Sequence, residues 1–293
     1  MTTTATVPER QNITQRGWTA IRGIFRSKSS KIGAAILIAI LLVLGAGLIG
    51  NHIPPNATNS GLNRPPSSSH IFGTDWLGHD LYSQIVWGAG PSLFVAIVGA
   101  LGSVVLGLMA GVFTGYFRKL QGPLGGISDI IMVFPVLPLL ILIGSLFQPS
   151  DLFIASLLVL VLWPVVARTI RAQVAAIKRL PFIDAAKMSG LSDIKIVFRI
   201  IIPEVAAIAI AYFIVNVSFA VVLTTALEFL GVGNPDVVSW GSILYWAQQF
   251  GFIAGDWWWV AIPGAFITML ATGFALIGFS FEETINPRLR SIA

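Results

Sequence analysis

Residues 92–116 read SLFVAIVGALGSVVLGLMAGVFTGY and contain no charged side chain. A helix that crosses a membrane needs about 20 mostly apolar residues, so this stretch predicts a membrane-spanning helix. Small residues recur along it at every fourth position: Gly99, Ser103, Gly107, Gly111 and Gly115. On a helix this spacing forms one smooth stripe, along which a second backbone can approach closely. We therefore expect tight packing against a neighbouring helix; a generic glycine-rich membrane helix is the weaker alternative.

The composition of the whole chain is that of a membrane protein. Of its 293 residues, 55% are apolar and 11% are charged, whereas soluble domains usually carry about 25% charged residues. The mean hydropathy is +0.83. These values exclude a disordered chain, a coiled coil and an ordinary cytosolic enzyme. The absence of cysteine excludes disulfides and thiolate metal sites, and the net charge of +5 indicates basic cytoplasmic loops and not nucleic-acid binding.

The apolar segments predict an all-α integral membrane protein with six transmembrane helices. The predicted spans cover residues 32–50, 92–117, 130–147, 152–167, 205–227 and 257–281. The remaining organisation is a cytoplasmic N-terminal segment at 1–31, an irregular Pro- and Ser-rich extracytoplasmic segment at 51–91, a five-helix core at 92–281 and a cytoplasmic tail at 282–293. Within 1–31, apolar residues recur at helical spacing, which fits a helix on the membrane surface or one packed on the protein itself: Trp18, Ile21, Ile24 and Phe25.

Basic side chains predict the orientation of the spans. All Lys and Arg residues except Arg64 fall in segment 1–31, at positions 118–119, in the loop 168–204 or in the tail. Cytoplasmic segments of membrane proteins are enriched in these residues. Both termini are therefore expected in the cytoplasm, in agreement with an even number of spans. A cleaved signal peptide is a weaker alternative for 32–50, because this run is longer than a typical signal core and no clear cleavage site follows it.

The loop at 168–204 is much longer than the 2–8 residues that usually connect two helices. Its middle predicts a helix of about two turns, because Pro181 suits the first helical position, Asp184 the first turn and Gly190 the left-handed position that ends a helix. Ala185 and Ala186 would give this helix a small exposed surface. It could dock into a groove on another protein or pack only on lipid headgroups. A second, amphipathic helix is expected over residues 191–202.

The loop at 168–204 resembles that of a known family. The pattern Asp184-Ala185-Ala186, then Gly190, then Ile200-Ile201-Ile202-Pro203 is similar to the EAA loop of ABC importer permeases, with Asp in place of Glu and Ile in place of Leu. In that family the loop forms a coupling helix that sits in a groove of the cytoplasmic ATPase. The resemblance therefore assigns the ATPase-coupling role to five residues: Asp184, Ala185, Ala186, Lys187 and Gly190.

Three further segments narrow the resemblance. Residues 72–81, FGTDWLGHDL, are similar to the segment before the second span of dipeptide, oligopeptide and nickel permeases, with His79 in place of the usual Arg. Residues 227–233, LEFLGVG, followed by Trp240-Gly241, are similar to the segment after the fifth span. The tail at 286–290 resembles the end of the family, although residues 278–283 depart from its usual pattern. The closest resemblance is to the C-type subunit, which implies a type I ABC importer permease fold.

The resemblance also implies the partners. A solute-binding protein would deliver solute outside the cell membrane, a second and different permease would form the other half of the pathway, and two ATPases would bind ATP and Mg²⁺. This chain has no P-loop segment and no H-E-x-x-H, so we expect no catalytic residues, no cofactor and no metal site of its own. Metal capture by its three histidines is the weaker alternative, because their spacing is not that of a helical ligand pair: His52, His70 and His79.

Five residues are candidates for the pathway or for contact with the binding protein. Tyr212 and Asn216 share a helix face in the fifth predicted span, where they could line the path or form interhelical hydrogen bonds. Glu228 could be a gate residue or an ion-pair partner. Asp75 and Asp80 could touch the binding protein, and Asp75 could instead cap a nearby helix.

The solute itself is left open by the sequence. Peptides or similar polar solutes are the first expectation and oligosaccharides the second. A passive channel or membrane scaffold is the alternative from another class. An ion-coupled carrier is disfavoured, because such carriers place ionisable groups within their spans and here such groups lie only at span edges.

Overall fold

A computed structural model describes residues 27–50, 53–58, 61–147, 150–234, 236–251 and 255–285. The described part contains helices and irregular segments, with one isolated β-bridge between Thr74 and Asp80. The predicted surface helix around Trp18, the tail at 286–290 and His52 lie outside the described residues. The helices are α2 Lys28–Gly50, α3 Leu81–Tyr116, α4 Arg118–Val133, α5 Val136–Ser145, α6 Asp151–Ile177, α7 Pro181–Met188, α8 Asp193–Ile196, η1 Val197–Ile201, α9 Ile202–Phe229, α10 Trp240–Trp246, η2 Ala247–Gly251 and α12 Trp257–Ile285.

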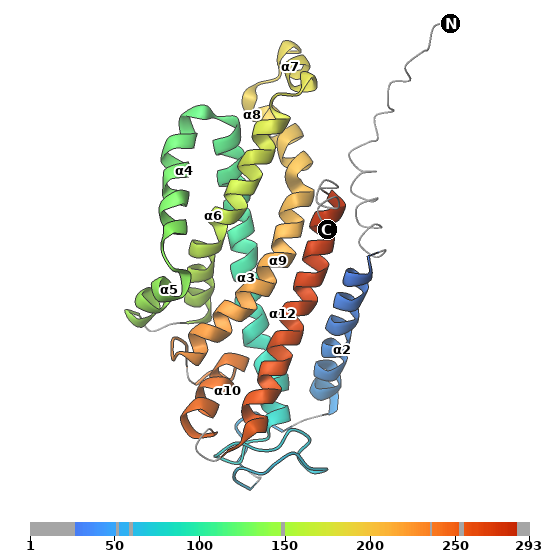
Figure 1. Cartoon of the computed structure of the whole chain (residues 1–293), viewed down its shortest axis with the longest axis vertical. Helices are drawn as coiled ribbons and strands as arrows, with labels where there is room; N and C mark the ends of the chain where they lie inside the picture. Colours follow the sequence, from blue (N-terminus) through green and yellow to red (C-terminus); the bar gives the residue numbers. More distant parts are fainter. Residues whose placement is uncertain are drawn as a thin grey trace, which may run out of the picture.

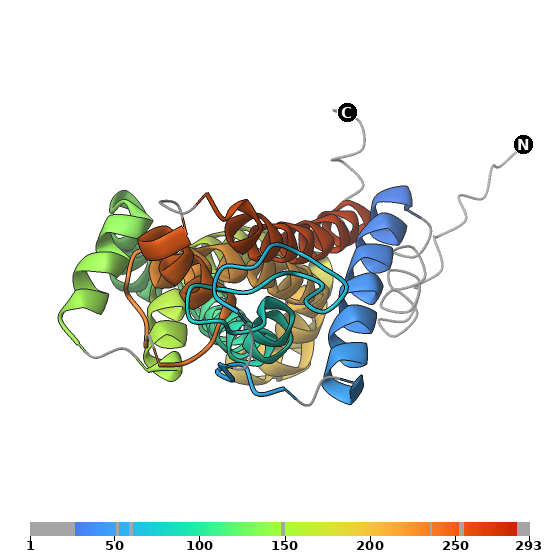
Figure 2. The ribbon, with the colours of Figure 1, turned by 90° about the horizontal axis from the view of Figure 1, so that it is seen from below.

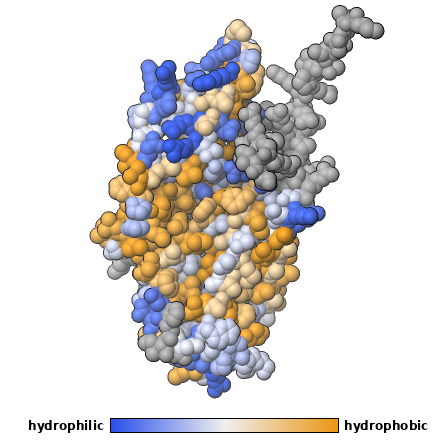
Figure 3. All heavy atoms as spheres, viewed as in Figure 1, coloured by the Kyte–Doolittle hydropathy of each residue, from blue (hydrophilic) through white to orange (hydrophobic). Residues whose placement is uncertain are grey.

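Four long helices, α3, α6, α9 and α12, form the body of the molecule (Figure 1). Helix α2 packs against α12 at one flank, and α4 and α5 lie at the opposite flank; the view from below separates the same two flanks (Figure 2). Apolar residues gather in a belt around the middle, with hydrophilic residues toward both ends (Figure 3). This distribution is the one expected of a helix bundle whose sides face lipid.

The third predicted span is not one straight helix. Among the described residues, five helices are long and apolar enough to cross a membrane, and α4 with α5 forms a sixth candidate that is bent by 92°. The bend falls at Phe134-Pro135. Pro135 has no N–H to donate and disfavours helical geometry at the residue before it, so a continuous helix over 130–147 was a wrong expectation.

The loop at 168–204 is also shorter than predicted. Helix α6 continues to Ile177. After the short helix α7, helical structure begins again at Asp193 and runs without interruption through α8 and η1 into α9. The predicted separate helix over 191–202 is therefore the first part of the fifth span. A π turn lies just before Pro203, where the Ile202 N–H donates to the Val197 carbonyl. The apolar runs predict shorter helices, because the helices extend beyond their apolar parts.

The stripe of small residues on α3 packs against α6, as predicted. A Cβ atom added at Gly107 would lie 2.6 Å from Val166 Cβ, and one at Gly111 would lie 2.7 Å from the Ala167 carbonyl oxygen. Similar approaches occur at Gly99 and Gly115. The two backbones are therefore too close for larger side chains, and the helix pair gains extensive van der Waals contact.

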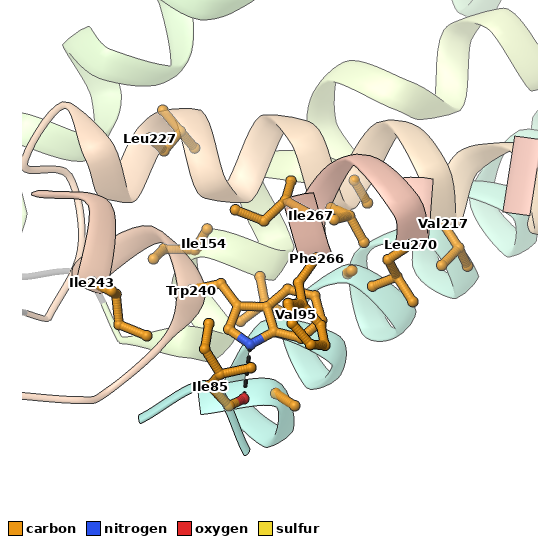
Figure 4. Packing of buried hydrophobic residues seen from close by; sticks show 14 of the residues in the cluster. Ile85, Val95, Ile154, Val217, Leu227, Trp240, Ile243, Phe266, Ile267 and Leu270 are labelled. Carbon is orange, nitrogen blue, oxygen red and sulfur yellow. Dashed lines mark hydrogen bonds between the residues drawn. The ribbon is translucent and has the colours of Figure 1, made fainter. Parts of the chain in front are cut away.

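A buried tryptophan joins α3, α10 and α12 at the end of the bundle where α10 lies. Trp240, the first residue of α10, is fully buried. Its indole Nε1 donates to the Ile85 carbonyl at 2.9 Å (Figure 4), and its ring lies 6.0 Å from that of Phe266 on α12. Burial of an aromatic ring with its N–H satisfied is strongly favourable. Trp240 thus holds α10 between α3 and α12.

Candidate functional site

Helix α7 projects from the end of the molecule at which α6 ends (Figure 1). It has Pro181 at its first position and Asp184 in its first turn. At its other end Gly190 adopts φ = +80°, the left-handed conformation that glycine tolerates without cost. The Gly190 N–H donates to the Lys187 carbonyl at 2.9 Å and the Leu191 N–H to the Ala186 carbonyl at 3.2 Å. These two bonds form a Schellman motif, so the predicted two-turn helix and its glycine end are confirmed.

One face of α7 is anchored and the other is free. Ile183 is fully buried in an apolar cluster formed by the ends of α3, α6 and α9, and Phe182 and Ala186 pack against the same cluster. Asp184, Ala185, Lys187 and Met188 are exposed. Ala186 is half-buried, so only one of the two alanines is fully on the free face. The result is a short helix whose exposed face cannot shift without disturbing the buried one.

A polar cluster beside α7 connects four helix ends. The Lys178 Nζ donates to the Tyr116 carbonyl at 2.6 Å, and the Tyr116 hydroxyl donates to Asp193 Oδ1 at 2.6 Å. The ammonium groups of Lys178 and Lys187 lie 5.0 Å and 5.8 Å from the centre of the Tyr116 ring, within the range of cation–π attraction. Tyr116, Lys178 and Asp193 were not singled out from the sequence, because nothing in their spacing places these separate helix ends together.

The opposite end of the bundle is organised by Asp75. The residue is 3% exposed. Oδ1 accepts the backbone N–H groups of Leu77 and His79 at 2.9 Å and 2.8 Å, and Oδ2 lies 2.8 Å from His79 Nδ1 and 2.7 Å from Gln84 Nε2. Asp75 therefore orders the loop before α3. The expected helix cap at Asp75 was wrong, because the amides that it binds belong to this loop.

Asp80 is the residue that caps a helix. It is the N-cap of α3 and accepts the Ser83 N–H at 2.9 Å. Its other oxygen lies 2.8 Å from His70 Nδ1. A carboxylate at this position satisfies an N–H that has no partner within the helix. Both candidate carboxylates are thus buried and engaged within the chain.

Glu228 joins the end of α9 to the start of α10. It is 8% exposed, and its Oε2 accepts the hydroxyl of Ser239 at 2.7 Å. Ser239 in turn is the N-cap of α10, in a capping box with Ser242. A Cβ at Gly241 would collide with the Glu228 carboxyl, which shows how closely the two segments approach. No basic side chain pairs with Glu228 in the described part of the chain.

Tyr212 and Asn216 both form hydrogen bonds between helices. The Asn216 Nδ2 donates to Ser103 Oγ at 2.9 Å, and both side chains are buried. The Tyr212 hydroxyl lies 2.9 Å from Thr169 Oγ1 on α6. Asn216 thus joins α9 to α3, and Tyr212 joins it to α6. The structure brings neither together with Glu228, which lies about three turns beyond Asn216 and about four beyond Tyr212 along α9.

The described residues contain no group of three or more His, Asp or Glu side chains placed to hold a metal ion. His70 and His79 instead contact different aspartates. These contacts give both histidines a structural explanation.

Comparison with known proteins agrees with the architecture. Residues 103–291 match the family model described as binding-protein-dependent transport system inner membrane component. A putative peptide transport system permease protein of Brucella suis is 31% identical, over 92% of this chain and 91% of the relative. The dipeptide transport system permease protein DppC of Alkalihalophilus pseudofirmus is 30% identical, over 97% and 94%.

A glutathione transport system permease protein of Pectobacterium atrosepticum is also 30% identical, over 88% of this chain and 87% of the relative. The family match extends from the stripe of α3 beyond the end of α12 and includes α7. It therefore covers α6, α9, α12 and the projecting helix, together with the second part of α3. The chain belongs to the family of inner membrane components of binding-protein-dependent transport systems.

Proposed function

We propose that this chain is the C-type permease subunit of an ATP-driven ABC importer, and that it forms half of the translocation pathway for peptides or similar polar solutes. The relatives carry the names of peptide, dipeptide and glutathione transport permeases. The helical bundle with its apolar belt is that of a multi-pass cell membrane protein. Peptides are therefore favoured over oligosaccharides, and a passive channel has no observation in its support.

The observation that carries the proposal is the form of α7. A machine driven by a separate ATPase needs a rigid contact whose geometry differs between two states. In α7 the exposed Asp184, Ala185 and Lys187 form the contact face, and the buried Ile183 transmits its movement to α3, α6 and α9. We assign ATPase coupling to this helix together with Gly190, which fixes its end.

The proposed orientation places α7 in the cytoplasm. Basic residues concentrate at this end of the bundle, in agreement with the positive-inside rule. Both termini then lie in the cytoplasm if α4 and α5 together make one crossing. The loop that Asp75 and Asp80 order faces outward, and we propose that these carboxylates shape the surface that a binding protein meets.

The remaining parts of the machine belong to partners. Two ATPase subunits would bind ATP and Mg²⁺, and a second, different permease would complete the pathway. Tyr212, Asn216 and Glu228 would act on the pathway by holding α9 against α3, α6 and α10, so their role is to position the helices that line it.

The decisive experiment measures ATPase activity of the reconstituted complex with its binding protein, against a panel of peptides and oligosaccharides. Stimulation by peptides supports the proposal in full. Stimulation by oligosaccharides alone would retain the importer and replace its solute. If the complex is assembled but no solute with its binding protein stimulates the ATPase activity, importer function is contradicted.

A variant of Gly190 tests the role of α7 itself. Space at this position is open, so a side chain meets no steric obstacle and acts only through the backbone. Valine resists the left-handed conformation, which costs an ordinary residue about 1–2 kcal/mol. Gly190→Val should therefore insert normally and lose solute-stimulated ATPase activity, whereas Gly190→Asn should retain most of it, because Asn tolerates positive φ. Normal stimulation in the valine variant would refute the assigned role.

A further inference from the structure

A pocket of about 510 Å³ lies beside α4 and α6, near the end at which α4 begins. Its lining comes from Arg118, Gln121 and Asp129 on α4, from Arg171 on α6, and from three glycines of α4. A Cβ at Gly122 or Gly126 would meet no atom within 4 Å. These glycines therefore keep the pocket open without being required by close helix packing.

The charges of the pocket favour an anion. In the described part of the chain, neither Arg118 nor Arg171 forms an ion pair, whereas Asp129 lies 3.9 Å from Arg168. The Arg171 guanidinium rests on α4, because a Cβ at Gly125 would lie 2.7 Å from its Nη1. The lining thus carries two arginines and one carboxylate, which lies beside Arg168, so positive charge prevails in the pocket. Guanidinium groups bind phosphate oxygens in a bidentate geometry.

The depth of the pocket matches the headgroup layer. Arg171 is twenty residues from the start of α6, which corresponds to about 30 Å along a helix, the thickness of a bilayer's hydrocarbon core. Arg118 follows directly after the cap of α3. Figure 3 shows hydrophilic residues above the apolar belt.

An apolar track continues from the pocket along α4. Gly126, Ile130 and Val133 follow one another at helical spacing, and Ile130 and Val133 are 62% and 83% exposed. A small free anion would make no use of these side chains, whereas an acyl chain would cover them. The charge and the track together describe a site for an amphiphile with a phosphate headgroup.

We propose that the pocket binds an anionic phospholipid, with its phosphate between Arg118 and Arg171 and an acyl chain along Ile130 and Val133. The site belongs to the cytoplasmic leaflet, an assignment that rests on the orientation proposed above. That leaflet is rich in anionic lipid, and basic pockets between transmembrane helices bind such headgroups.

The test measures lipid retention by the full-length chain, after extraction from bilayers that contain phosphatidylglycerol and phosphatidylcholine. Stepwise delipidation followed by native mass spectrometry gives the affinity of the last lipid held. The wild type should retain phosphatidylglycerol. Arg118→Gln/Arg171→Gln should bind it roughly 30-fold more weakly, because each basic side chain near an anionic membrane contributes about fivefold.

Two further variants make the test specific. Lys119→Gln/Arg179→Gln removes the same charge from exposed positions outside the pocket and should retain the lipid. Gly126→Leu fills the pocket without changing charge and favours the helix, so it should lose the lipid even if the arginine variant folds poorly.

The proposal is overturned if the Gly126→Leu chain keeps phosphatidylglycerol, if the control pair loses it equally, or if phosphatidylcholine is retained as well as phosphatidylglycerol. Displacement of the lipid by inorganic phosphate would also overturn the proposal, because the pocket would then be a site for a free anion. None of these readouts needs ATPase or transport. A failure here is therefore distinct from a failure of the importer proposal.

Discussion

Substitution of Gly111 by alanine should weaken the bundle, although the same change in an open helix strengthens it. The added Cβ would lie 2.7 Å from the Ala167 carbonyl oxygen and 2.7 Å from Ile170 Cβ. Carbon atoms in favourable contact are about 3.5–4.0 Å apart, so α6 must withdraw by about 1 Å. The obstructing oxygen belongs to the backbone and cannot rotate away.

Two opposing contributions set the magnitude. Overpacking of a tight contact costs about 1–3 kcal/mol, and replacement of glycine by alanine within a helix returns up to about 1 kcal/mol. We expect a net loss of about 1 kcal/mol for Gly111→Ala. Gly264→Ala on α12 meets no atom within 4 Å and should gain up to about 1 kcal/mol. The matched variants then differ by about 2 kcal/mol, roughly 30-fold in the unfolding equilibrium constant.

Unfolding in mixed micelles, followed by fluorescence while a denaturing detergent is titrated, measures both variants against the wild type. The reasoning predicts opposite shifts of the midpoint. If both alanines stabilise the protein alike, α3 and α6 do not approach as closely as the structure has them. The helix pair would then not depend on its stripe of small residues.

Three other predictions concern single contacts. A double-mutant cycle of Ser103→Ala and Asn216→Ala should give a coupling free energy of about 0.6 kcal/mol and up to about 1.7, and additive effects would contradict their hydrogen bond. Burial raises the pKa of Asp256, so the folded chain holds this proton more tightly than the unfolded chain does. The free energy of unfolding should then fall as the pH rises from near the ordinary pKa of an aspartate toward the raised pKa of Asp256. In pH-dependent melting, Asp256→Asn should abolish that fall, and the variant should be more stable than the wild type at neutral pH. Ile183→Ala should reduce solute-stimulated ATPase activity, because a buried side chain holds α7 in place, whereas Met188→Ala, at an 83% exposed position, should leave the fold intact; equal melting temperatures and equal activity in both variants would refute the anchor.

Several features of the fold could be predicted from local patterns. The apolar runs locate the crossing helices, and the four-residue spacing of glycines in α3 predicts the tight packing that Gly107 and Gly111 show. The helix at 181–188 follows from Pro181 and Gly190, since an N-terminal proline and a left-handed glycine act within one or two turns. Short-range rules of this kind depend only on neighbours in the chain.

Helix lengths and the bend of the third span were harder to predict. The apolar runs predict helices that begin at residue 92 and end at residue 167, yet α3 begins at Leu81 and α6 continues to Ile177. A helix ends where its backbone loses partners and packing, and that point need not coincide with the edge of an apolar run. Pro135 indicates a break in the helix, but the 92° angle between α4 and α5 depends on the packing around α5.

The sequence by itself determined that this chain is a basic, multi-span membrane protein with a short capped helix outside its spans, because composition and local spacing suffice for these conclusions. Only the tertiary structure decided the partners of the polar side chains. Asn216 donates a hydrogen bond to Ser103, more than a hundred residues away, and no local pattern indicates that partner. The sequence does not show that Asp75 is buried in its own loop, where it accepts hydrogen bonds from Leu77 and His79. Burial and hydrogen bonding between distant segments depend on three-dimensional packing, which local sequence patterns do not contain.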